Sequence, residues 1–109
     1  MPKYMVEASY TAEGLHGLAK DTAAGRRSAA TRAVEGVGGK LEAIYFSLGE
    51  RDVIIICDMP DTVTAAAVSL AASGTGLVRT RTTALLTVEE CDQALNMTVK
   101  YRAPGKAKK

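Results

Sequence analysis

The sequence has few of the residues that carry metal, cofactor or disulfide chemistry. It contains no tryptophan, one histidine and two cysteines, and only 5% of its residues are aromatic. His16 is the single imidazole, and Cys57 and Cys91 are too far apart in the chain to form the short cysteine spacings of a zinc site. We therefore expect no metal and no cofactor. We also expect two reduced thiols that pack as small apolar groups.

Long apolar segments are missing as well. No run approaches the roughly 18 to 20 residues that span a bilayer, and the N-terminal MPKYMVEASY has neither the apolar stretch nor the cleavage site of a signal peptide. These features predict a cytoplasmic location and no membrane partner. The 109 residues are 47% hydrophobic and 24% charged, which is typical of one small globular domain.

The excess of positive charge is confined to one end of the chain. Fourteen Lys and Arg against 12 Asp and Glu give a net charge of +2, but residues 102–109 (RAPGKAKK) hold four of the basic residues and no acid. Residues 1–101 therefore carry 10 − 12 = −2. A nucleic-acid-binding domain usually carries its basic residues on a folded face, so we expect no nucleic-acid partner. The sequence predicts a domain over 1–101 and a flexible basic tail over 102–109.

Hydrophobic periodicity predicts seven elements. The pattern indicates strands over 3–10, 40–48, 52–58 and about 77–86, and helices over 11–37, 61–73 and about 88–98. Glycines weaken the first helix, where we expect a break around 21–25. The order β-α-β-β-α-β-α predicts an α+β, ferredoxin-like split βαβ fold. Its four-stranded antiparallel sheet has the order 4-1-3-2, with the helices on one face.

The second face of that sheet needs a cover. A sheet with helices on one face is expected to be polar on the other, yet the strands at 40–48 and 52–58 are apolar on both faces. A second copy of the same sheet is the simplest cover, because a self-complementary apolar patch gives a two-fold dimer or a higher oligomer. The alternative is that the C-terminal segment covers this face.

Four residues on the second face form a candidate ligand site. The period of two places Glu7 on this second face and places Arg79 and Arg81 together on one face of the adjacent strand. If the two arginines point away from the helices, they meet Glu7 and, together with Tyr45, line this face. Guanidinium groups there could bind a carboxylate or phenolate between two packed sheets. The alternative is that these residues form cross-strand or intersubunit salt bridges.

Other candidates for chemistry have simpler interpretations. His16 is a possible general base, and the alternative is a surface histidine on a helix. Gly36-Val37-Gly38-Gly39-Lys40 and Gly74-Thr75-Gly76 lack the spacing of a phosphate-binding loop, and they are more typical of helix ends.

The chain resembles the GYD domain family over residues 2–104. The resembling stretches are PKYMVEASYTAEGL at 2–15, GGKLE at 38–42, LGERDVIIICDMPD at 48–61, and SGTGLVRTRTTALLT at 73–87 with the following Glu89-Glu90. The Gly-x-Tyr-Asp motif of the family stands here as Gly49-Glu50-Arg51-Asp52, so arginine replaces the tyrosine. Gly49 and Asp52 also suit a tight turn, glycine through positive φ and aspartate through an Asx-type hydrogen bond.

The resemblance implies fold more than function. The family is similar to the dimeric α/β barrels, which pair ferredoxin-like sheets face to face and include small-molecule monooxygenases, isomerases, stress-responsive proteins and haem enzymes. Three hypotheses follow: a homo-oligomer that binds a small anionic or aromatic molecule between sheets, a structural or interaction module without a ligand, and a cofactor-independent isomerase or monooxygenase-like enzyme with His16 as the base.

Overall fold

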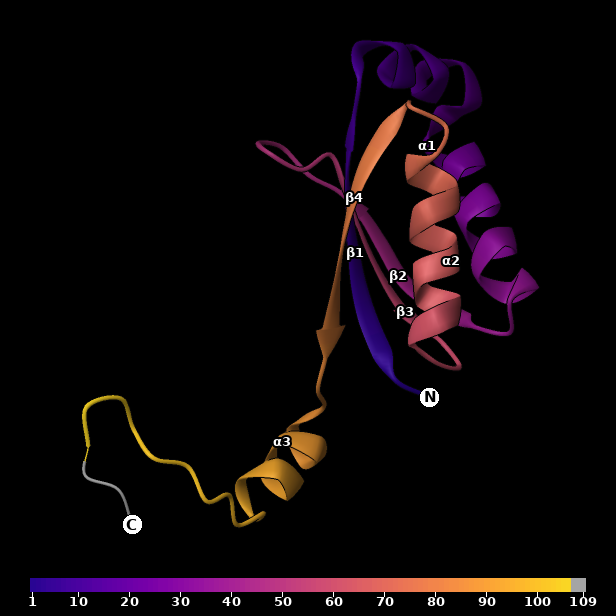
Figure 1. The fold of residues 1–109 in the computed structure, drawn as a ribbon. Helices are drawn as coiled ribbons and strands as arrows, with labels where there is room; N and C mark the ends of the chain where they lie inside the picture. Colours follow the sequence, from indigo (N-terminus) through magenta and orange to yellow (C-terminus); the bar gives the residue numbers. More distant parts are fainter. Residues whose placement is uncertain (107–109) are drawn as a thin grey trace.

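Seven helices and strands follow one another in the computed structural model, which describes residues 1–106 (Figure 1). In chain order they are β1 (Lys3–Tyr10), α1 (Ala12–Gly36), β2 (Lys40–Phe46), β3 (Val53–Asp58), α2 (Thr62–Ser73), β4 (Val78–Leu85) and α3 (Val88–Leu95). The strands form one antiparallel sheet in the order β2-β3-β1-β4, which is 4-1-3-2 counted from the other edge. The predicted α+β fold is confirmed. Lys108 and Lys109 of the predicted basic tail lie outside the described residues.

The predicted break in the first helix is present at Thr22. This residue has φ 69° and ψ 161° inside α1, and its Oγ1 accepts a hydrogen bond of 3.1 Å from the Gly25 amide. Thr22 therefore acts as a second N-cap within the helix. The last helix is shorter than predicted and ends at Leu95, because the amides of Asn96 and Met97 bond back to Asp92 and Ala94 in a closing turn.

The core lies between the sheet and the helices α1 and α2, which cover the same face (Figure 1). Tyr4, Val6 and Ala8 point alternately from β1 into this layer and are buried. Cys57, on the neighbouring strand β3, is only 2% exposed. Burial, with the Asp58 carboxylate nearby, raises the pKa of the Cys57 thiol.

The other face, called the open face below, carries none of the helices within residues 1–106 (Figure 1). Its central residues are apolar, with Met5 on β1 paired with Ile56 on β3, and Ile54 one row further along. The alternative cover, the C-terminal segment, does not lie on this face. Residues 86–102 are all exposed, and α3 extends away from the sheet beyond the end of β4 (Figure 1).

Candidate functional site on the open sheet face

The strand register places the four sequence-predicted ligand residues on the open face. Glu7 lies directly opposite Arg81, and Ser9 lies opposite Arg79. Glu7 is also opposite Ile54, which in turn pairs with Tyr45. Tyr45, Ile54, Glu7 and Arg81 therefore form one row across all four strands.

Glu7 makes an ion pair that the sequence interpretation missed. Its Oε2 lies 3.9 Å from Nε of Arg51, in the loop between β2 and β3. Arg51 occupies the tyrosine position of the Gly-x-Tyr-Asp motif, so the loop supplies a cation where that motif has a phenol. The period of two along the strands could not identify this contact, because Arg51 lies outside them.

The motif residues hold that loop against the end of β1. The Tyr10 amide donates a hydrogen bond of 2.7 Å to Oδ2 of Asp52, and the Asp52 amide donates one of 2.9 Å to the Ala8 carbonyl. The carboxylate thus bonds to a neighbouring strand instead of closing its own turn, which corrects the Asx-type interpretation. Gly49 has φ +110°, in the region that favours glycine, as predicted.

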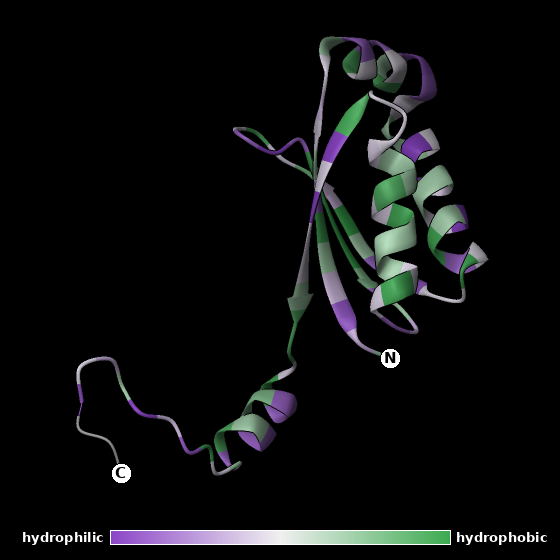
Figure 2. Ribbon diagram, viewed as in Figure 1, coloured by the Kyte–Doolittle hydropathy of each residue, from purple (hydrophilic) through white to green (hydrophobic). Residues whose placement is uncertain are grey.

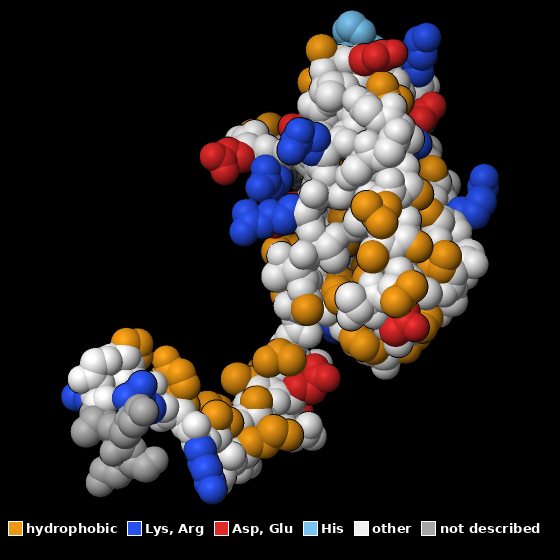
Figure 3. Space-filling view, in the orientation of Figure 1, with side chains coloured by type: hydrophobic (Ala, Val, Ile, Leu, Met, Phe, Trp, Pro, Cys, Tyr) orange, Lys and Arg blue, Asp and Glu red, His pale blue; other side chains and the backbone are white. Residues whose placement is uncertain are grey.

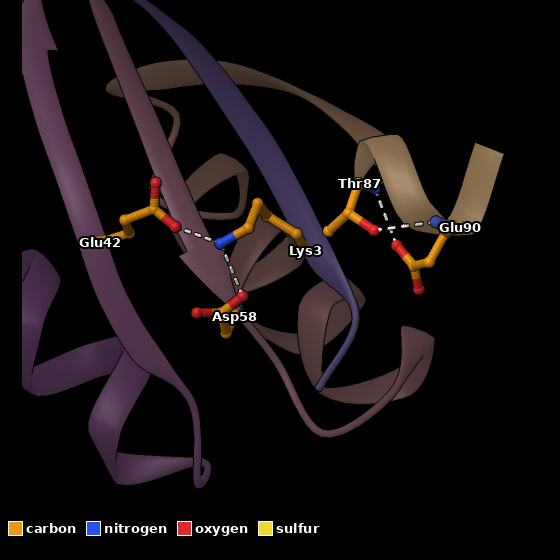
Figure 4. Close-up of polar contacts among 5 residues, drawn as sticks. All are labelled: Lys3, Glu42, Asp58, Thr87 and Glu90. Carbon is orange, nitrogen blue, oxygen red and sulfur yellow. Dashed lines mark hydrogen bonds and ion pairs between the residues drawn. The ribbon is translucent and has the colours of Figure 1, made fainter. Parts of the chain in front are cut away.

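Arg79 and Arg81 differ from Lys3, another cation of this face. At the opposite end of the sheet, Lys3 is paired with Glu42 and with Asp58, the latter at 2.9 Å, and both carboxylates raise the pKa of its ammonium group (Figure 4). Arg79 and Arg81 are exposed, and within residues 1–106 neither has a carboxylate within 4.0 Å. Basic side chains gather where the loop between β2 and β3 projects (Figure 3).

Tyr45 lies in the same row as Arg81 but far from both arginines. It lies on the edge strand β2, it is 68% exposed, and β3 and β1 separate it from β4. With strands about 4.8 Å apart, Tyr45 is roughly 14 Å from Arg81 within one chain. One chain therefore brings together Glu7, Arg51, Arg79 and Arg81, and leaves Tyr45 at the far edge.

His16 lies elsewhere. It is exposed in the part of α1 that precedes the break at Thr22, whereas Glu7, Tyr45, Arg79 and Arg81 lie on strands of the sheet. Its predicted role as a base stays a prediction. Among the described residues, no three His, Cys, Asp or Glu side chains lie together in a way that could hold a metal ion. None of the helices described is long and apolar enough to cross a membrane.

A cavity between the helices and the sheet was not predicted. It has a volume of about 410 Å³ and an apolar lining, within the range of small-molecule sites. Alanines of α1 and α2 face Val6 and Ile55 of the sheet, and their short side chains leave the space unfilled. The helical alanines that line it are Ala29, Ala30, Ala33, Ala65, Ala67, Ala71 and Ala72. The high alanine content of both helices is the sequence signal that could have indicated it.

The comparisons with known proteins support the resemblance found in the sequence. The sequence model of one family, described as GYD domain, matches residues 4–95. This match runs from the second residue of β1 to the last residue of α3. Comparison with curated proteins and with solved structures gave no match.

Proposed function

The chain belongs to the GYD domain family, and we propose that it works as a homo-oligomer that binds a small anionic or aromatic molecule between two packed sheets. The observation that carries the proposal is the pair Arg79 and Arg81, which have no carboxylate partner within the described residues and lie at the edge of an apolar sheet face. Exposed cations beside an apolar surface suit a ligand with an apolar body and one negative group.

Face-to-face pairing of two sheets would also bring Tyr45 close to the arginines of the other subunit. If the two-fold axis runs along the strands between the two sheets, rotation places β4 of one subunit opposite β2 of the other. Residues of one row stay at the same height, so Tyr45 would face Arg81 of the partner subunit across about 10 Å, the usual spacing of packed sheets. Each edge of the dimer would then hold one complete site, with a phenol from one subunit and two guanidiniums from the other.

The chemistry of such a site favours binding. Arg79 and Arg81 are two residues apart on one strand, which separates their Cα atoms by about 6.8 Å. The ion pair of Glu7 with Arg51 would limit the movement of these two side chains on the side of the site next to the arginines. A carboxylate or phenolate could accept hydrogen bonds from both guanidiniums, and Tyr45 could stack on an aromatic ring. No described residue beside these groups is an imidazole, which favours the binding hypothesis over the enzyme hypothesis.

The test is the double variant Arg79→Ala/Arg81→Ala, measured by calorimetry against benzoate, salicylate and 4-hydroxybenzoate. We expect the variant to lose at least about tenfold in affinity and to keep its oligomeric mass, because the apolar centre of the face is intact. The control Lys20→Ala/Arg27→Ala removes two exposed cations from α1 and should bind as the unmodified protein does. If the unmodified protein binds none of these acids, and the double variant also fails to assemble, the structural-module hypothesis replaces this proposal.

The apolar cavity is a second candidate site for the ligand, favoured by its volume and lining. Ala30→Leu would fill part of it without touching the open face. Binding that survives in Arg79→Ala/Arg81→Ala but is lost in Ala30→Leu would place the ligand in the cavity. Binding that is lost only in the arginine variant would support the site between the sheets.

A further inference from the structure

The segment that follows β4 has an apolar surface that this chain does not bury. We call residues 86–106 the arm; it comprises α3 and the extended chain after it. Its large apolar side chains are each 66% to 75% exposed, namely Leu86, Val88, Leu95, Met97, Val99 and Tyr101. The arm leaves the end of the sheet, and apolar residues recur along it (Figures 1 and 2). Such a concentration on a monomer surface marks an interaction site.

The charges of the arm fall into two halves of opposite sign. Its first half, α3, contains Glu89, Glu90 and Asp92 and no base. The part of the second half that the structure describes contains Lys100, Arg102 and Lys106 and no acid. Two such arms that run antiparallel place each acidic half against a basic half. The arm is therefore complementary to a second copy of itself, as a two-fold interface requires.

The open face alone is small for a stable dimer. Four strands about 4.8 Å apart, with about seven residues each, outline on the order of 450 Å². A typical specific interface buries about 800 Å² on each partner. An additional apolar contact would enlarge this interface, and the arm is continuous with β4 at the edge of that same face.

We propose that the arms of two subunits pair with each other in antiparallel orientation, acidic half against basic half, at one end of the sheet dimer. This inference rests on the proposed face-to-face pairing of the sheets. It fits the axis that brings Tyr45 opposite Arg81 of the partner subunit, because a two-fold axis along the strands makes both β4 strands, and so both arms, leave the same end of the dimer. From there the arm extends to the side of the sheet away from α1 and α2 (Figure 1), across that axis, and two segments that cross a two-fold axis run antiparallel to each other. The apolar side chains of the two arms are buried between them.

The test uses two full-length variants whose arms carry net charges of opposite sign. Glu89→Lys/Asp92→Lys makes the arm basic, and Lys100→Glu/Arg102→Glu makes it acidic; Glu90 is left in place because its carboxylate accepts a hydrogen bond from the Thr87 amide in the capping box (Figure 4). Native mass spectrometry and sedimentation measure the dimers that each variant forms, alone and in a mixture. We expect each variant alone to dimerise at least about tenfold more weakly than the unmodified protein.

The mixture distinguishes arm pairing from a general effect of charge. Basic and acidic arms should attract each other, so we expect the heterodimer to make up well over one half of all dimers, the share that random mixing gives. Salt at 0.5 M should reduce this excess. The control Lys20→Glu/Arg27→Glu on α1 should dimerise as the unmodified protein does. Variants that dimerise normally and mix statistically would overturn the arm pairing and leave the sheet pairing standing. An unmodified protein that stays monomeric at every concentration would overturn both.

Discussion

Gly14→Ala is expected to destabilise the fold by about 3 kcal/mol or more. A Cβ at this buried position in the first turn of α1 would lie 2.2 Å from the carbonyl oxygen of Leu77, which is backbone and cannot rotate away. The same oxygen accepts hydrogen bonds from the Thr11 amide, at 2.9 Å, and from its hydroxyl, at 3.2 Å. Moving the helix away would therefore break the link between its N-cap and the start of β4.

Thermal unfolding measures this effect. For a domain of this size, the expected loss corresponds to a decrease in Tm of roughly 15 °C. Gly17→Ala is the matched control, since it lies three residues further along the same helix with no atom within 4 Å of the added Cβ. Alanine is the better helix former there and should stabilise by about 0.5 to 1 kcal/mol. A Gly14→Ala protein as stable as the unmodified one would show that α1 does not approach Leu77 as described.

Asp52→Ala is expected to cost about 2 kcal/mol of unfolding free energy, because the variant leaves the Tyr10 amide without its carboxylate acceptor at the end of β1. This hydrogen bond holds the loop that presents Arg51 to Glu7. The substitution should therefore also weaken anion binding on the open face.

Urea unfolding and calorimetry measure the two effects on the same protein. Glu50→Ala is the control, because Glu50 is exposed in the same loop and only its backbone carbonyl bonds to Ser9. It should leave both quantities within about 0.5 kcal/mol of their original values. An Asp52→Ala protein with unchanged stability would mean that the motif aspartate has no role in holding the loop.

Local patterns were sufficient to predict the elements and their order. The alternation along β1 and the weak helix around residue 22 each have a local physical cause, and each is present in the structure. Strand order and the period of two indicated that Glu7 could share a face with Arg79 and Arg81, and the structure adds the register that sets Glu7 opposite Arg81. Sequence reasoning of this kind identifies which residues share a face of the sheet.

Contacts between elements were less predictable. The ion pair of Glu7 with Arg51 and the hydrogen bond of Asp52 to Tyr10 depend on how the loop after β2 folds back, which no periodicity describes. The cavity depends on how far two alanine-rich helices stand from the sheet. The distance between Tyr45 and Arg81 follows only from the strand order and the strand spacing taken together. Because this distance is large within one chain, the proposed site depends on a second subunit.

Cross-linking between Tyr45→Cys and Arg81→Cys chains tests the central claim, that two open faces pack together about an axis along the strands. Both variants carry Cys91→Ser, and Cys57 is buried and should stay unreactive. In the proposed dimer the two positions face each other across about 10 Å, whereas two copies of either position lie roughly 17 Å apart. A bismaleimide that spans about 10 Å between thiols should therefore link the mixed chains efficiently and each variant alone poorly. Self-linking of Tyr45→Cys or Arg81→Cys that equals or exceeds the mixed product would contradict the account.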